Sequence, residues 1–131
     1  MGQPVVHFEI IGSDPAALRG YYAELFGWEY AVGGATAEGI SQPDDYGFVD
    51  ATTNGDGIGI NGGINGGVGG GAGYRRQALY VGVPDVEAVL REAECLGGTR
   101  QMGPAQAPGG DLVVGHLTDP EGNLIGVAGL A

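Results

Sequence analysis

Two stretches of this 131-residue chain carry the same pattern, and this internal repeat limits the fold more than any other feature. Residues 7–14 (HFEIIGSD) and 78–85 (ALYVGVPD) each combine a strand-like apolar run with a glycine and a closing aspartate. Leu25-Phe26-Gly27 and Leu96-Gly97 then follow at matching places, with one residue of slippage. Copies about seventy residues apart are too widely spaced for a solenoid. The sequence therefore predicts two copies of one half-domain.

Each half predicts the element order β-α-β-β-β. In the first half, Ser13-Asp14-Pro15 is a helix start with proline at the first helical position, and Gly27 suits the helix end. In the second half, Asp85 is the expected helix cap and Gly97 the expected stop. The expected strands are residues 5–11, 28–32, 46–51 and 57–61 in the first half, and 77–83, 99–103, 112–118 and 124–128 in the second.

Glycine accounts for 29 of the 131 residues, and residues 62–73 are mostly glycine. Such a tract is typical of a flexible linker, because glycine has no side chain to bury. We therefore expect a single domain over residues 1–131. Its first module spans about 4–62, its linker 62–74 and its second module about 75–131.

The charge of the chain excludes several classes of partner. Five arginines face 16 acidic residues, which gives a net charge of −11. This field repels phosphate groups, so we expect neither a nucleic-acid partner nor a membrane surface. Arg75-Arg76 is expected to be a solvated pair, and the lone Cys95 excludes an internal disulfide. The sequence shows no secretory signal and no membrane-spanning stretch, so the expected location is cytoplasmic.

Four segments in this order resemble one known superfamily: Val6–Glu9, Asp14–Trp28, Tyr80–Val86 and Thr118–Asn123. The sequence is similar to the vicinal oxygen chelate superfamily, which includes glyoxalases, bleomycin-resistance proteins and extradiol dioxygenases. The resemblance implies an α+β fold with two tandem βαβββ modules that form a curled sheet around a shared cleft, usually in a dimer.

Enzymes of this superfamily typically carry metal ligands on the first and last strands of each module. His7 matches one of these positions, whereas Ala78 and Gly126 fill two others and Gly59 is the expected fourth. Catalytic zinc usually has three protein ligands. We therefore expect no metal and no other cofactor. A less favoured alternative is an unorthodox site of His7, Glu9 and His116.

Strand alternation predicts which side chains line the cleft. The candidate ligand-binding residues are His7, Glu9, Trp28, Phe48, Asn61, Tyr80, Met102 and His116. Tyr30 and Tyr46 are further candidates for its walls. Packing against a helix is a near-equal alternative for five of these residues: Trp28, Tyr30, Tyr46, Phe48 and Met102. A cleft lined by glycine and aromatic residues suits a bulky, planar ligand.

Two functions remain open. The first is metal-independent binding that sequesters a bulky aromatic natural product or antibiotic, as superfamily members do that protect cells from bleomycin, mitomycin or enediynes. This interpretation assigns no catalytic residue. The second is a glyoxalase-like lyase or isomerase with an atypical or absent metal site, in which Glu9 or His7 is the base. The missing ligands favour binding.

We also expect a homodimer, because an open, curled sheet leaves strand edges that need cover. The modules pair within one chain or are exchanged between two chains, and the sequence leaves both arrangements open.

Overall fold

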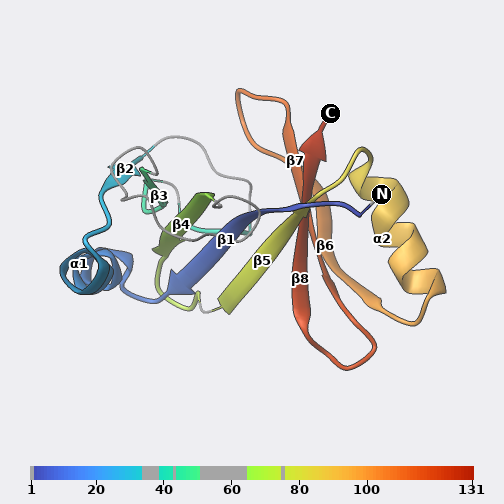
Figure 1. Ribbon diagram of the computed structural model, residues 1–131, viewed down its shortest axis with the longest axis horizontal. Helices are drawn as coiled ribbons and strands as arrows, with labels where there is room; N and C mark the ends of the chain where they lie inside the picture. The colour runs from blue at the N-terminus through green and yellow to red at the C-terminus, as the bar shows by residue number, and fades with distance from the viewer. Residues whose placement is uncertain (1, 34–38, 43, 51–64, 75) are drawn as a thin grey trace.

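The computed structural model describes residues 2–33, 39–42, 44–50, 65–74 and 76–131, and in these ranges eight strands form one curled, open sheet with two helices (Figure 1). The strand order is β2-β3-β4-β1-β5-β8-β7-β6. The elements are β1 (Val5–Gly12), α1 (Pro15–Phe26), β2 (Tyr30–Val32), β3 (Gly47–Val49), β4 (Asn65–Gly70), β5 (Arg76–Gly82), α2 (Val86–Cys95), β6 (Thr99–Gln106), β7 (Leu112–Thr118) and β8 (Leu124–Leu130). Neither helix is long and apolar enough to cross a membrane.

The first strands of the two halves lie side by side at the centre of the sheet. β1 and β5 are antiparallel, and the last strand of each half lies parallel to its own first strand, β4 beside β1 and β8 beside β5. The remaining two strands of each half extend the sheet outward with antiparallel pairing. The predicted α+β fold with two βαβββ modules is therefore confirmed.

Both helices start where the sequence predicts. The Asp14 side chain accepts a hydrogen bond from the Ala17 amide at 3.1 Å, and Asp85 accepts one from Ala88 at 3.0 Å. Helix α1 ends at Gly27, whose φ of 73° is left-handed and costs glycine little. These caps fix where each helix leaves the sheet.

The strand register assigns the two faces of the sheet. Phe8 lies opposite Leu79 across β1 and β5, whereas Glu9 lies opposite Ala78 on the other face. Helix α1 packs on the Phe8 face and α2 packs on the continuation of that face over β7 and β8. We call the opposite face, which carries Glu9 and Ala78, the inner face.

Part of the glycine-rich tract forms a strand and not a linker. Residues 65–70 form β4, between β3 and β1. A Cβ atom on Gly66 would lie 1.9 Å from the Phe8 ring, and one on Gly67 would lie 2.1 Å from the Tyr46 hydroxyl oxygen. Aromatic rings thus lie directly on the β4 backbone from both faces, which only glycine permits. The linker prediction is corrected for these residues, and the strand expected at residues 57–61 lies outside the described ranges.

This packing predicts opposite outcomes for two glycine-to-alanine substitutions. Gly66→Ala forces a methyl group into the Phe8 ring, and we expect it to destabilise the fold by about 1–3 kcal/mol. Gly20→Ala places the same methyl group on an open side of α1, and we expect it to stabilise the fold by about 0.5–1 kcal/mol. Urea denaturation of both variants and the parent chain measures the two changes. A Gly66→Ala protein as stable as the parent would contradict the close ring contact.

Candidate functional site

A buried carboxylate lies at the centre of the inner face. Glu9 on β1 is only 2% exposed. The hydroxyl of Tyr80, from the neighbouring strand β5, donates a hydrogen bond of 2.9 Å to Glu9 Oε2. The Nε atom of Arg76, two pleats earlier on β5, lies 3.6 Å from the same oxygen. Strand alternation explains this grouping, since Arg76, Ala78 and Tyr80 point to the same face of β5.

A histidine from the second module extends this contact. His116 Nε2 lies 2.6 Å from the Tyr80 hydroxyl oxygen, and both side chains are buried. On β7 the neighbouring Leu117 points the other way and packs with α2, as the sequence predicts. His116, Tyr80 and Glu9 therefore form one continuous hydrogen-bonded chain across β7, β5 and β1.

A second tyrosine and a second histidine of the first module lie near Glu9 on the inner face. His7 Nε2 lies 2.8 Å from the hydroxyl oxygen of Tyr46, which precedes β3. Burial and the nearby Glu9 charge raise the pKa of this Tyr46 hydroxyl. Two tyrosines thus lie near Glu9, and each tyrosine hydrogen-bonds to one histidine. We call these five side chains the His-Tyr-Glu network.

Burial sets the protonation of this network. It lowers the pKa of His7 to about 4, and burial together with the Arg76 charge lowers the pKa of His116 to about 4. Burial raises the pKa of Glu9, whereas hydrogen bonds from Tyr80 and the Arg76 charge oppose that shift. Both tyrosine pKa values are raised by burial and by the Glu9 charge. At neutral pH both histidines are therefore uncharged and both phenols keep their protons.

The structure brings six of the eight predicted ligand-binding residues to the inner face. His7, Glu9, Tyr80 and His116 are the network members just described. Phe48 on β3 is 42% exposed, and its ring centroid lies 6.1 Å from that of His7. Met102 on β6 lies opposite His116 and packs against the inner-face core.

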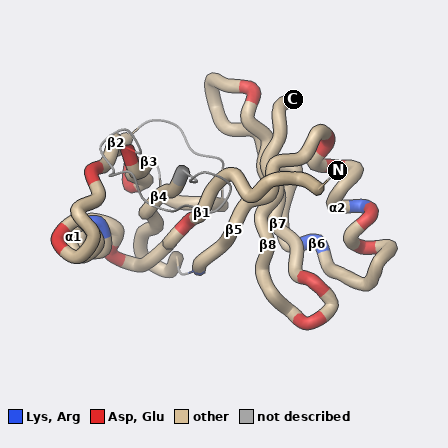
Figure 2. The backbone as a smooth tube through the Cα atoms, in the orientation of Figure 1, with Lys and Arg blue, Asp and Glu red and all other residues tan. Residues whose placement is uncertain are grey.

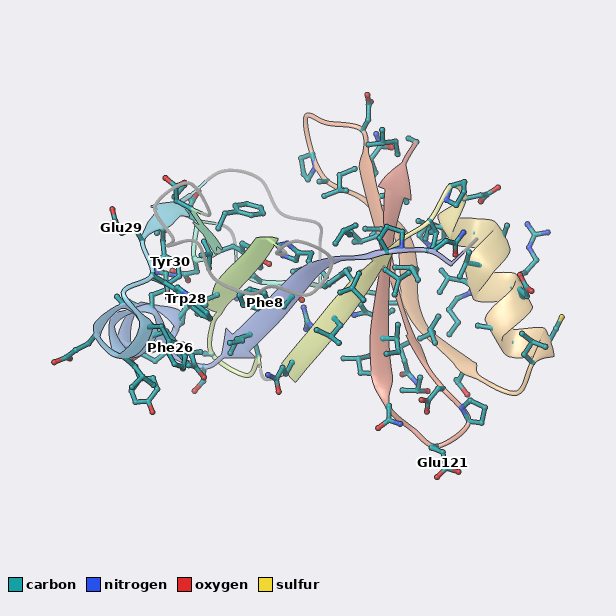
Figure 3. All side chains as sticks on the ribbon, viewed as in Figure 1. Phe8, Phe26, Trp28, Glu29, Tyr30 and Glu121 are labelled. Atoms are coloured by element: carbon teal, nitrogen blue, oxygen red, sulfur yellow. The ribbon has the colours of Figure 1, made fainter. Side chains whose placement is uncertain are left out.

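The other two predicted residues are not part of this group. Trp28 lies on the helix-bearing side, with ring centroids 5.3 Å from Phe8 and 5.2 Å from Phe26 (Figure 3). It fills the space between α1 and the sheet, which is the packing alternative that the sequence left open. Asn61 lies outside the described residues.

Arg76 is the participant that sequence reasoning missed. The arginine pair was expected to be solvated, but the Arg76 side chain is only 18% exposed and also donates to the Ile40 carbonyl. Strand alternation could have identified Arg76, because Arg76, Ala78 and Tyr80 occupy every second position of β5 and therefore share one face. Tyr46 was expected only as an aromatic wall, but its hydroxyl also hydrogen-bonds to His7.

The metal-ligand positions of the superfamily are unsuited to a metal here. Gly126 on β8 lies opposite Tyr80, and a Cβ atom there would lie 2.5 Å from the Tyr80 ring. The register also corrects the expected counterpart in the first module. Gly67 lies opposite Glu9 as Gly126 lies opposite Tyr80, so Gly67 takes the place assigned to Gly59.

Tyrosine rings therefore occupy the space that two carboxylate ligands would need. The Tyr46 ring covers Gly67 and the Tyr80 ring covers Gly126. Ala78 is buried and has no donor atom. Within the described residues no three His, Cys, Asp or Glu side chains gather into a metal-binding group. The residues present do not fit the metal of the superfamily.

The model of the glyoxalase-like domain family matches residues 7–128. The chain belongs to this family. Its fold is shared by methylmalonyl-CoA epimerase from Mycobacterium tuberculosis, with a TM-score of 0.60, 14% identity and coverage of 98% of this chain and 88% of that one. It is also shared by a glyoxalase/bleomycin resistance protein/dioxygenase superfamily member from Vibrio splendidus 12B01, with a TM-score of 0.51, 13% identity and coverage of 99% and 100%. No curated protein sequence matches this glyoxalase-like protein significantly.

The depressed pKa of His116 predicts a pH-dependent stability difference. The folded-state pKa of about 4 lies below the unfolded value of 6.5, so folding favours the neutral imidazole. This contribution is complete above pH 6.5 and is lost as the pH falls toward 4. At pH 5 the loss relative to pH 7.5 is about 2 kcal/mol for the parent chain.

A His116→Gln variant has no such titration, so its stability deficit should shrink by about this amount between pH 7.5 and pH 5. Urea denaturation of both proteins at the two pH values measures it, and the remaining titratable groups are common to both. A deficit that stays constant with pH would show that His116 is not held neutral by the fold.

Proposed function

We propose that this glyoxalase-like protein binds and sequesters a flat aromatic small molecule on its inner face, without a metal and without catalysing a reaction. The observation that carries the proposal is the contrast between a buried polar layer, whose side chains hydrogen-bond to one another, and an exposed ring beside it. Glu9, Tyr80 and His116 are at most 4% exposed and hydrogen-bond to one another. Phe48, on the same face, leaves 42% of its surface exposed next to His7.

Such a surface favours binding by ring contact. A rigid floor preserves its shape when a ligand arrives, so little conformational entropy is lost on binding. Aromatic contacts contribute about 0.5–1.5 kcal/mol each beyond the area that they bury. The exposed faces of Phe48 and His7 offer such contacts, and the half-buried Met102 adds an adaptable apolar neighbour.

The charge of the chain narrows the ligand class. The net charge is −11, and acidic residues are distributed along both modules whereas basic residues are few (Figure 2). This field attracts cations and repels anions over roughly one Debye length, about 10 Å at moderate salt. We therefore propose a cationic or neutral polycyclic ligand, of the kind found among aromatic natural products and antibiotics.

One observation favours a second function. Glu9 is a buried carboxylate with a raised pKa, and such groups serve as bases in proton-transfer enzymes. A metal-independent lyase or isomerase that uses Glu9 is the alternative. The two proposals differ in one variant, Glu9→Gln, which abolishes turnover in the enzyme but leaves ring contacts with Phe48 in the binding protein.

Ligand binding on the inner face predicts a selective effect of the Phe48 ring. We expect proflavine, a planar cation, to bind saturably, and Phe48→Ala to weaken its affinity about twofold to tenfold by removing one ring contact. Tyr21→Ala is the matched control, because Tyr21 is an exposed ring on α1 and therefore on the other side of the sheet.

The fluorescence of proflavine itself reports on binding. Trp28 is unsuitable as the reporter because it packs between α1 and the sheet. Equal losses of affinity in the two variants, or no saturable binding of any planar aromatic cation in a broader panel, would contradict the proposal.

The absence of ligand atoms at Ala78, Gly67 and Gly126 predicts that stability is independent of divalent metal. Dialysis of the purified protein against EDTA should leave its melting temperature unchanged. Elemental analysis before dialysis should find no stoichiometric metal, even after expression in zinc- and nickel-supplemented medium. Stoichiometric zinc or nickel whose removal lowers the melting temperature would show that a metal site exists.

A further inference from the structure

We infer that two copies of this chain associate through the outer face of the sheet. By outer face we mean the helix-bearing side of β1 and β5 together with the side of α1 that borders these strands. The interface is independent of the proposed ligand, because the inner face lies on the opposite side of the same strands.

The two helices leave the centre of the outer face uncovered. α1 packs mainly on β4 and α2 on β6 and β7, so the helices lie toward opposite ends of the sheet (Figure 1). The outer-facing residues of β1 and β5 between them are Phe8, Ile10, Gln77, Leu79 and Val81. Leu79 is 45% exposed, although it lies opposite Phe8 on a central strand. An apolar sheet face is normally buried against another layer, and the described part of the chain supplies none over Leu79.

Helix α1 extends this apolar surface. Tyr21, Leu25 and Phe26 are each more than half exposed. Tyr21 borders a groove of about 720 Å³ between α1 and β1, which Ile10 and Leu18 also line. Contiguous exposed apolar residues of this kind mark interaction sites, and aromatic residues are enriched at the cores of protein interfaces. The exposed strands and the exposed side of α1 therefore form one continuous candidate interface.

Electrostatics favours a second copy of this chain as the partner. Each copy has a net charge of −11, so two copies repel one another over most of their surface. The outer-facing positions of β1 and β5 hold no charged side chain, because Glu9 and Arg76 point to the inner face. A basic partner would be recognised by exposed carboxylates, which these strands lack on this side. An uncharged apolar surface instead suits a partner that is itself acidic.

The exposed area of the chain is large enough for such an interface. The chain exposes 7586 Å², whereas a monomeric protein of 13.2 kDa exposes roughly 6400 Å². The excess is therefore about 1200 Å². Each partner of a standard protein interface buries about 800 Å². Association through the outer face would bring the exposed area into the range of an ordinary folded chain.

The outer face is also self-complementary. α1 forms a ridge on one side of the face, and the uncovered strands β1 and β5 form a floor beside it (Figure 1). In a two-fold symmetric dimer each copy presents both features, so α1 of each copy covers β1 and β5 of the other. The two inner faces then point away from each other, and each chain keeps its own surface for a ligand.

A charged substitution at the centre of the outer face tests the inference. We expect the parent chain to sediment as a dimer of twice the 13.2 kDa chain mass at micromolar concentrations. Leu79→Glu should raise the dissociation constant at least about 30-fold, because it buries an unpaired carboxylate on each side of the interface. Leu112→Glu is the matched control, because Leu112 is a strand leucine of similar exposure, 43%, that shares the inner face with Val114.

Circular dichroism and urea denaturation show whether each variant folds. If Leu79→Glu does not fold, Leu25→Glu on α1 replaces it with the same expected loss of affinity, since glutamate is a good helix former at this exposed position. A parent chain that is monomeric throughout the micromolar range would overturn the inference. Equal dimer affinities in the outer-face variant and Leu112→Glu, whether both are kept or both are lost, would also overturn it. Two chains that exchange modules without using the outer face would give parental affinity in both variants.

Discussion

The buried Glu9 carboxylate is the group on which the rest of the inner face depends. An isolated charge at 2% exposure costs several kcal/mol unless it is paired and hydrogen-bonded. The first module supplies Glu9 and Tyr46, but Arg76 and Tyr80 come from the second, and Tyr80 lies 71 residues further along the chain. The carboxylate is therefore satisfied only when both modules are assembled, which couples the two halves through one polar cluster as well as through the β1–β5 ladder.

Glycine makes this cluster sterically feasible. Tyr80, which donates to Glu9, and Tyr46 both lie flat on a neighbouring strand, where Gly126 and Gly67 leave room for their rings. A larger residue at Gly126 would push the Tyr80 ring away and remove its hydrogen bond to the carboxylate. A larger residue at Gly67 would displace the Tyr46 ring, which hydrogen-bonds to His7. The high glycine content of the chain is thus a packing feature of the central sheet, and the same two positions are where the superfamily resemblance places metal ligands in enzymes.

The sequence predicted those parts of the molecule in which the side chains form a recognisable pattern, such as a helix cap or an alternating strand. The helix caps at Asp14 and Asp85 and the alternation of β1, β5 and β7 gave the fold and placed Glu9, Tyr80 and His116 together. Strand β4 was not predicted, because a run of glycines shows no alternation of apolar and polar side chains from which a strand can be inferred. Trp28 was ambiguous because it precedes a strand of only three residues, which gives its position no fixed parity.

The strand register also shows which residues of the two modules occupy equivalent positions. Glu9 corresponds to Tyr80, and each lies opposite a glycine of its own module. The residues on the far side of those glycines correspond too: Phe48 lies opposite Gly67 as His116 lies opposite Gly126.

In the second module this position holds a buried imidazole that completes the hydrogen-bonded chain. In the first module it holds a phenyl ring that makes no hydrogen bond and stays 42% exposed. One module therefore closes the polar network while the other leaves an aromatic surface beside it. The two modules share one backbone arrangement but carry different residues at equivalent positions. The exposed aromatic surface, and with it the proposed ligand contact, therefore lies on the first module.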